Sequence, residues 1–187
     1  MDIKNLKSVE TEHWHDLDVA YSASKRMFIL AEEKLKNMEL FPAPLLEHRD
    51  ALDHIMRYSR LIEKNGLCNE AISELANAKQ HEIRAFFDIA DYICITIRLE
   101  IASTLDVLTK RQITKIWPDY KDVRKKVINL STEIAEIRTE RKETIDAIPR
   151  YEVAVDKMFE VYQTYQLEVL PKIGKGFIYR LHRLLNG

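Results

Sequence analysis

The stretch FFDIADYICITIRLEI, residues 86–101, decides the fold class of this chain. Apolar side chains surround a helix drawn through it on nearly every side, so neighbouring elements must cover it from several directions. The β-branched residues from Ile93 to Ile97 are also common in strands. The apolar pattern is too long for a strand, however, and it contains no turn signal. We therefore predict a buried central helix that runs from near Asn69 to about Asp106.

The composition also favours an all-α protein. The 187 residues include only 4 glycines and 5 prolines, whereas strand-based folds need many turns rich in both. Charged residues make up 32% of the chain, but the formal net charge is −1, so no overall field attracts nucleic acid or an anionic membrane. Four charged residues argue against a membrane span in the apolar segment, namely Asp88, Asp91, Arg98 and Glu100.

Two amphipathic helices are predicted before the central one. In the first, from about Glu12 to Met38, apolar residues recur every three or four positions, and Thr11 is a suitable N-cap. The second begins near Pro44, since proline is favoured in the first turn of a helix. It ends before Gly66, because glycine readily adopts the left-handed conformation that terminates helices.

The longest apolar pattern lies in the C-terminal part. Apolar residues three and four positions apart recur from Val123 to Val169, which is the heptad spacing of coiled coils and long bundles. Arg141 and Thr144 weaken this pattern, and Pro149 interrupts it. Because the spacing keeps its register across Pro149, we predict either one kinked helix or two closely joined helices.

These patterns together predict an all-α fold. We expect an elongated antiparallel helical bundle with a long coiled-coil-like C-terminal helix or kinked helix pair. Residues 1–116 form the bundle, and residues 117–187 pack on it within one continuous domain. Pro118 marks the division, because proline restricts the residue before it. A turn after Pro171 precedes a short basic helix from Phe177 to Leu185.

Familiar catalytic signatures are absent from the sequence. It has no phosphate-binding glycine loop, no nucleophile elbow and no HExxH zinc motif. Cys68 and Cys94 form no CxxC pair and have no zinc-site neighbourhood, which favours a reducing compartment and a cytoplasmic location. We therefore expect neither a cofactor nor a metal ion.

One polar helix face carries candidate chemistry. On the second predicted helix, the side opposite the apolar residues gathers two arginines, two aspartates and a histidine: Arg49, Asp50, Asp53, His54 and Arg57. Several of these residues are four positions apart and could form ion pairs along a solvated helix, each worth ~0.2–0.5 kcal/mol. The structural interpretation is therefore an ordinary solvated helix face.

The functional interpretation rests on a resemblance. Arg49-Asp50-Ala-Leu-Asp-His54 resembles the R-x(4–6)-H motif of the HEPN superfamily, small helical proteins that include many metal-independent ribonucleases. Asp50 matches the polar residue that members commonly carry after the arginine. The resemblance implies a bundle that dimerises and brings two motifs together at one interface. It further implies an RNA substrate and a toxin or phage-defence role, or a catalytically inactive scaffold of the same type.

The implied chemistry assigns a role to each of the three residues. His54 would act as general base or acid while an RNA 2′-hydroxyl attacks the adjacent phosphate. Arg49 would stabilise charge on the phosphoryl oxygens, and Asp50 would orient the imidazole. On an ideal helix Arg49 and His54 point ~140° apart, so a second subunit or a helix irregularity is needed to bring them together.

The alternative is a non-catalytic interaction or oligomerisation protein. Its heptad seam, residues 123–169, would bind a second copy or another protein. Under either interpretation we expect a homodimer or a higher oligomer and no membrane association.

Overall fold

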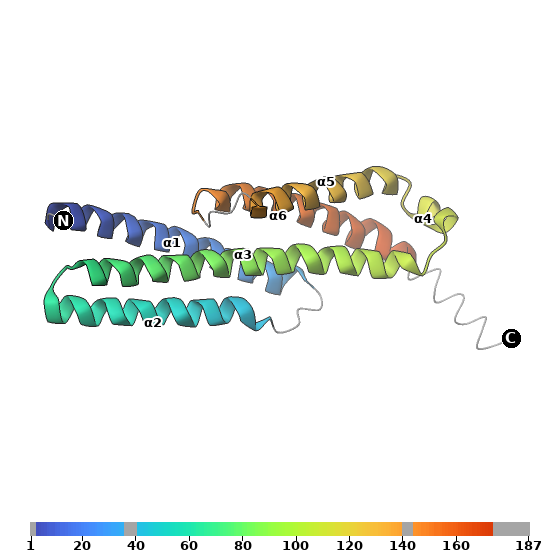
Figure 1. The fold of residues 1–187 in the computed structure, drawn as a ribbon. Coiled ribbons are helices and arrows are strands. Elements are labelled where there is room, and N and C mark those ends of the chain that lie inside the picture. Colours follow the sequence, from blue (N-terminus) through green and yellow to red (C-terminus); the bar gives the residue numbers. More distant parts are fainter. Residues whose placement is uncertain (1–2, 36–40, 140–143, 174–187) are drawn as a thin grey trace. The chain divides into compact units, whose positions relative to one another are not determined.

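The computed structural model describes residues 3–35, 41–139 and 144–173 of the chain. Every regular element in this part is helical, so the predicted all-α fold is confirmed. Figure 1 shows the elements in order. They are α1 (Ile3–Lys34), α2 (Pro42–Asn65), α3 (Asn69–Asp106), α4 (Lys110–Ile116), α5 (Tyr120–Thr139), α6 (Ala147–Thr164) and the π-helical turn η1 (Tyr165–Val169).

The helices form two compact units. Unit 1 comprises Met1–Ile93 with Glu140–Glu152, and unit 2 comprises Cys94–Thr139 with Val153–Gly187. Helices α3 and α6 therefore contribute residues to both units. The domain boundary between residues 116 and 117 stays a prediction.

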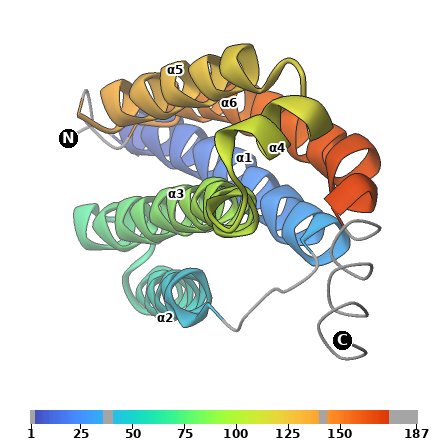
Figure 2. The same ribbon diagram turned by 90° about the vertical axis from the view of Figure 1, so that its right-hand side faces the viewer.

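Within unit 1, α1, α2 and the first part of α3 alternate in direction. Contacts of α2 with α1 and with α3 pair early residues of one helix with late residues of the other, as antiparallel neighbours do (Figures 1 and 2). The core between them includes Leu17, Leu75 and Ala78, against which Ile55 and Tyr58 pack. Small alanines at such positions let the helices approach closely.

The central helix has the predicted bounds, Asn69–Asp106. In unit 1 its residues Phe86 and Phe87 are buried, and the ring of Tyr151 meets both edge-on, with centroids 6.0 and 5.2 Å away. The Tyr151 hydroxyl donates a hydrogen bond to the buried carboxylate of Asp91, which satisfies both polar groups. Later in the helix, Leu99 is exposed, so neighbouring elements cover α3 on all sides along only part of its length.

The ends of α1 differ from the prediction. The helix begins at Ile3, and Thr11 lies inside it, where its hydroxyl donates to the Lys7 carbonyl oxygen at 2.9 Å. The prediction that Thr11 is an N-cap is therefore wrong. Met38, where the helix was expected to end, lies outside the described residues. The end of α2 is confirmed, since Gly66 has a φ of 70° and its N–H reaches the Ile62 carbonyl oxygen.

The heptad pattern is divided between two helices, α5 and α6. Pro149 lies in the first turn of α6, where its missing N–H leaves no intrahelical bond unmade. Of the two arrangements predicted at this proline, the structure therefore shows the joined pair. The seam residues Leu130, Ile134 and Ile137 are buried, as are most apolar seam residues of α6. These side chains serve the chain's own core.

Two further features, helix α4 and the π-helical turn η1, were not predicted. Helix α4 begins with a capping box in which Thr109 and Gln112 satisfy each other's backbone N–H groups, a T-x-x-Q signal present in the sequence. Residues 170–173 are helical and follow η1, so the predicted turn does not begin at Pro171; Gly174 and Gly176, which also marked it, lie outside the described residues. A π-helical turn commonly accommodates such an interruption of the hydrogen-bond pattern. The predicted helix from Phe177 to Leu185 lies outside the described residues.

Within unit 2, tyrosine hydroxyls of α6 and η1 form hydrogen bonds with α3. Tyr162 donates to Glu100 at 2.5 Å, and Tyr165 donates to Thr104 at 2.7 Å, so both reach from the C-terminal segment to α3.

Among the helices that the structure describes, none has the length and hydrophobicity needed to cross a membrane.

Candidate functional site

A pair of histidines lies between α2 and α3. Both helices carry a glutamate followed seven residues later by a histidine, Glu47 and His54 on α2 and Glu74 and His81 on α3. Because the helices are antiparallel, each histidine meets the glutamate of the other helix. His54 Nδ1 lies 2.6 Å from Glu74 Oε2, and His81 Nδ1 lies 2.8 Å from Glu47 Oε2.

The two imidazole rings stack at the centre of this arrangement. Their centroids are 5.1 Å apart and their planes differ by 26°. Arg84 borders His81, with Nη2 2.7 Å from His81 Nδ1 and Nε donating to Glu47 at 2.9 Å. His81 Nδ1 can either donate to Glu47 or accept from Arg84, and protonation decides which contact is a hydrogen bond. The proton on His81 is therefore coupled to this arginine–glutamate pair.

The contact with Glu74 favours one tautomer of His54. Its side chain is 18% exposed, and the Glu74 carboxylate favours a proton on Nδ1. The other ring nitrogen, Nε2, is then the one suited to accept a proton. Partial burial strengthens the contact between His54 and Glu74, because little water competes for either group.

Arg49 and Asp50 form a second, more exposed element of the site. The arginine side chain is 68% exposed, and its Nε and Nη2 both donate to Asp50 Oδ1, at 2.9 and 2.7 Å. This hydrogen-bonded guanidinium holds the pKa of Asp50 below its ordinary value, with smaller contributions from nearby His81 and His54. Asp50 is therefore anionic at neutral pH and orients Arg49.

The three residues that the sequence singled out thus do not form one hydrogen-bonded cluster. Arg49 and Asp50 pair with each other, and the ring nitrogen of His54 that Asp50 was expected to orient lies against Glu74. Sequence reasoning missed Glu74 and His81. The repeated seven-residue spacing of glutamate and histidine on two successive helices was the available signal.

An apolar stripe lies on the outer surface of α2. This helix buries only Pro44 and Ala51. Leu45, Leu52 and Met56 are exposed and share one helix face with Arg49, at spacings of three and four residues, so the prediction that Arg49 lies opposite the apolar residues is wrong. We call these four residues the α2 stripe. Contiguous exposed apolar side chains of this kind commonly mark a protein interface.

A serine, a histidine and a glutamate form another polar chain in unit 1. Ser24 Oγ lies 3.1 Å from His48 Nε2, and His48 Nδ1 lies 3.0 Å from Glu82 Oε1, the order found in serine hydrolases. Ser24 is completely buried, however, so no substrate can reach its hydroxyl. We interpret this chain as a structural link between α1, α2 and α3.

The comparisons with protein-family models, curated proteins and solved structures return no significant match. Among residues 3–35, 41–139 and 144–173, no group of three or more histidine, cysteine, aspartate or glutamate side chains is placed to hold a metal ion.

Proposed function

We propose that this protein is a HEPN-like, metal-independent endoribonuclease whose active site forms where two copies meet along α2. The observation that carries the proposal is the α2 stripe, which places exposed Arg49 among apolar side chains that a second copy would bury. His54, held by Glu74, lies on the side of the same helix that faces α3, so the dimer must bring Arg49 of one copy around to this side of the other. A cytoplasmic role as a toxin or in phage defence belongs to the same proposal.

A second copy supplies what one helix cannot. Arg49 and His54 project ~140° apart on α2, so both cannot point at one phosphate within a single chain. In a two-fold dimer the same stripe on both copies forms the interface. Arg49 of one copy then approaches His54 of the other across the crossing helices, and the dimer contains two equivalent sites.

The reaction follows from the proton chemistry of His54. Its Nε2 accepts the proton of an RNA 2′-hydroxyl while O2′ forms a bond to the adjacent phosphorus. The bond from phosphorus to the 5′-oxygen breaks, and that oxygen receives the proton from the same, now protonated, His54 imidazole. Arg49 stabilises the negative charge on the phosphoryl oxygens through its planar donors. The products are a 2′,3′-cyclic phosphate and a 5′-hydroxyl.

The direct test is RNA cleavage by the purified chain. We expect cleavage of single-stranded RNA in the presence of excess EDTA, with 2′,3′-cyclic phosphate ends identified by mass spectrometry. RNA methylated at every 2′-oxygen should resist, because it has no 2′-hydroxyl to attack. Absence of cleavage, or equal cleavage of the methylated RNA, would contradict the proposal.

The α2 stripe makes a separate prediction about assembly. Leu45→Glu and Met56→Glu should each convert a dimer into a monomer and abolish cleavage, because each places a charge in the buried apolar interface. Sedimentation velocity reports the mass, and far-UV circular dichroism reports retained helicity. Leu99→Glu is the matched control, since Leu99 is also an exposed apolar residue but lies on α3. A wild-type chain that is monomeric while it cleaves RNA would rule out the composite site.

A further inference from the structure

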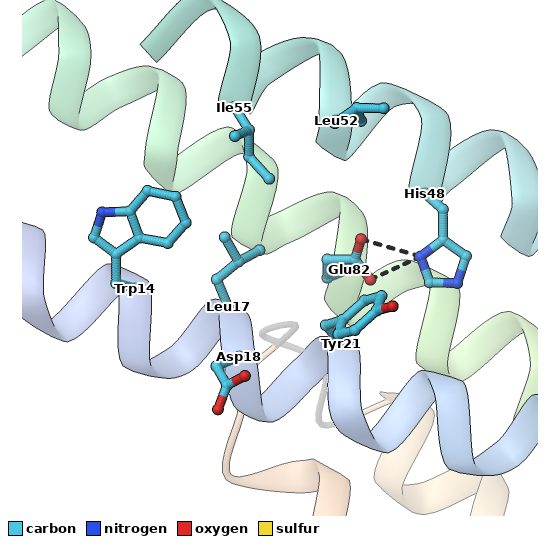
Figure 3. Close-up of a pocket in the computed structure, with 8 residues that line it drawn as sticks. All are labelled: Trp14, Leu17, Asp18, Tyr21, His48, Leu52, Ile55 and Glu82. Atoms are coloured by element: carbon cyan, nitrogen blue, oxygen red, sulfur yellow. Dashed lines mark hydrogen bonds and ion pairs between the residues drawn. The ribbon is translucent and has the colours of Figure 1, made fainter. Parts of the chain in front are cut away.

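A pocket of about 450 Å³ lies in unit 1 between α1 and α2 (Figure 3). Its volume is within the range of small-molecule sites. Most of its wall is apolar or aromatic, and the polar groups gather at the end formed by His48 and Glu82. The lining residues are Trp14, Leu17, Asp18, Tyr21, His48, Leu52, Ile55 and Glu82.

Glu82 is the unusual member of this lining. Its side chain is only 7% exposed, and Oε1 lies 3.0 Å from His48 Nδ1. Oε2 lies 2.8 Å from the same nitrogen, so the two carboxylate oxygens share one N–H group of His48. A buried carboxylate that shares a single donor has fewer hydrogen bonds than it can accept. A bound molecule that supplies another N–H to this carboxylate would remove the deficit.

The charged residues that line the pocket favour a positively charged hydrogen-bond donor. Asp18 and Glu82 contribute two carboxylates, and no lysine or arginine is among the lining residues. Trp14 and Tyr21 add aromatic rings, whose faces attract cations. The lining therefore matches a positively charged group attached to an apolar body.

We propose that this pocket binds a small hydrophobic ammonium ion, a primary amine on an aromatic or aliphatic body. The ammonium lies at the end of the pocket formed by His48 and Glu82 and donates to the Glu82 carboxylate, and the body lies against Trp14, Leu17 and Ile55. The pocket includes neither His54 nor His81 and shares only Leu52 with the α2 stripe, so the inference does not depend on ribonuclease activity.

The test uses three probes of nearly equal size on the full-length wild-type chain. These are 2-phenylethylamine (a cation), 2-phenylethanol (neutral) and 3-phenylpropionate (an anion). Two-dimensional ¹H–¹⁵N NMR follows the two tryptophan indole N–H signals, assigned with Trp14→Phe. We expect the amine to shift the Trp14 signal, leave Trp117 unchanged, and bind at least ~10-fold tighter than either other probe, since one charge-assisted hydrogen bond distinguishes them.

Glu82→Gln identifies the group responsible. It should weaken binding of the amine by ~10-fold or more, while Glu70→Gln, an exposed change on the same helix, should leave binding unaltered. No shift of Trp14 with the amine, equal binding of the three probes, or unchanged binding by a folded Glu82→Gln variant would each overturn the proposal. If Glu82→Gln fails to fold, the comparison of the three probes on the wild-type chain still tests whether the pocket prefers a cation.

Discussion

Arg49→Ala and His54→Ala should each lower RNA cleavage by about 10²- to 10⁴-fold, the contribution expected of a general acid–base group or a charge-stabilising donor. His54 provides the proton transfer that starts the reaction, and Arg49 stabilises the phosphoryl oxygens. The measurement is the initial cleavage rate in EDTA, together with a thermal melt of each variant. The melt matters because His54→Ala leaves partly buried Glu74 without its partner.

Two matched substitutions serve as controls. Arg57→Ala removes another exposed arginine of α2, and His15→Ala removes an exposed histidine of α1. Both should cleave RNA at the wild-type rate. Equal losses in Arg49→Ala and Arg57→Ala would indicate that arginines act only by general attraction of RNA.

Mixing the two inactive variants tests the composite site directly. If Arg49 of one copy acts with His54 of the other, a mixed dimer of Arg49→Ala and His54→Ala chains contains one intact site and one that lacks both residues. Cleavage should therefore reappear on mixing, after brief denaturation and refolding to exchange subunits. No recovery, in samples shown by mass spectrometry to contain mixed dimers, would place the site within one chain.

Phe86→Ala should destabilise the protein by about 3–5 kcal/mol, the usual effect of removing a buried aromatic ring. Phe86 is fully buried and contacts both Phe87 and Tyr151, so its loss leaves a cavity at the point where three rings meet. This is a large part of the 5–15 kcal/mol typical of a whole domain. Urea unfolding followed by far-UV circular dichroism gives the free energy of unfolding.

The control for this substitution lies on the same helix. Leu99→Ala removes a side chain that is 64% exposed, so its effect should stay below ~0.5 kcal/mol. A loss of less than about 1 kcal/mol in Phe86→Ala would mean that this cluster is not a tightly packed part of the core.

Local sequence alone determined several of the helices, though not all of their ends. The bounds of α3 and the end of α2 at Gly66 were predictable because the apolar period and the glycine act within a few neighbouring residues. The start of α1 was missed because threonine at position 11 can serve either as a cap or, as here, as an interior residue that bonds to the preceding turn. Local pattern does not separate these two outcomes.

Only the tertiary structure decided which side chains meet. Arg49 and Asp50 are neighbours in the chain and pair locally, whereas His54 meets Glu74 and His81, 20 or more residues away. The register of α2 against α3 fixes these contacts, and it depends on core packing along both helices. The sequence therefore determined the all-α class but not the faces of α2, because Arg49 shares its face with exposed apolar residues. Interhelical packing determined that His54 faces α3, where it pairs with Glu74 and stacks on His81.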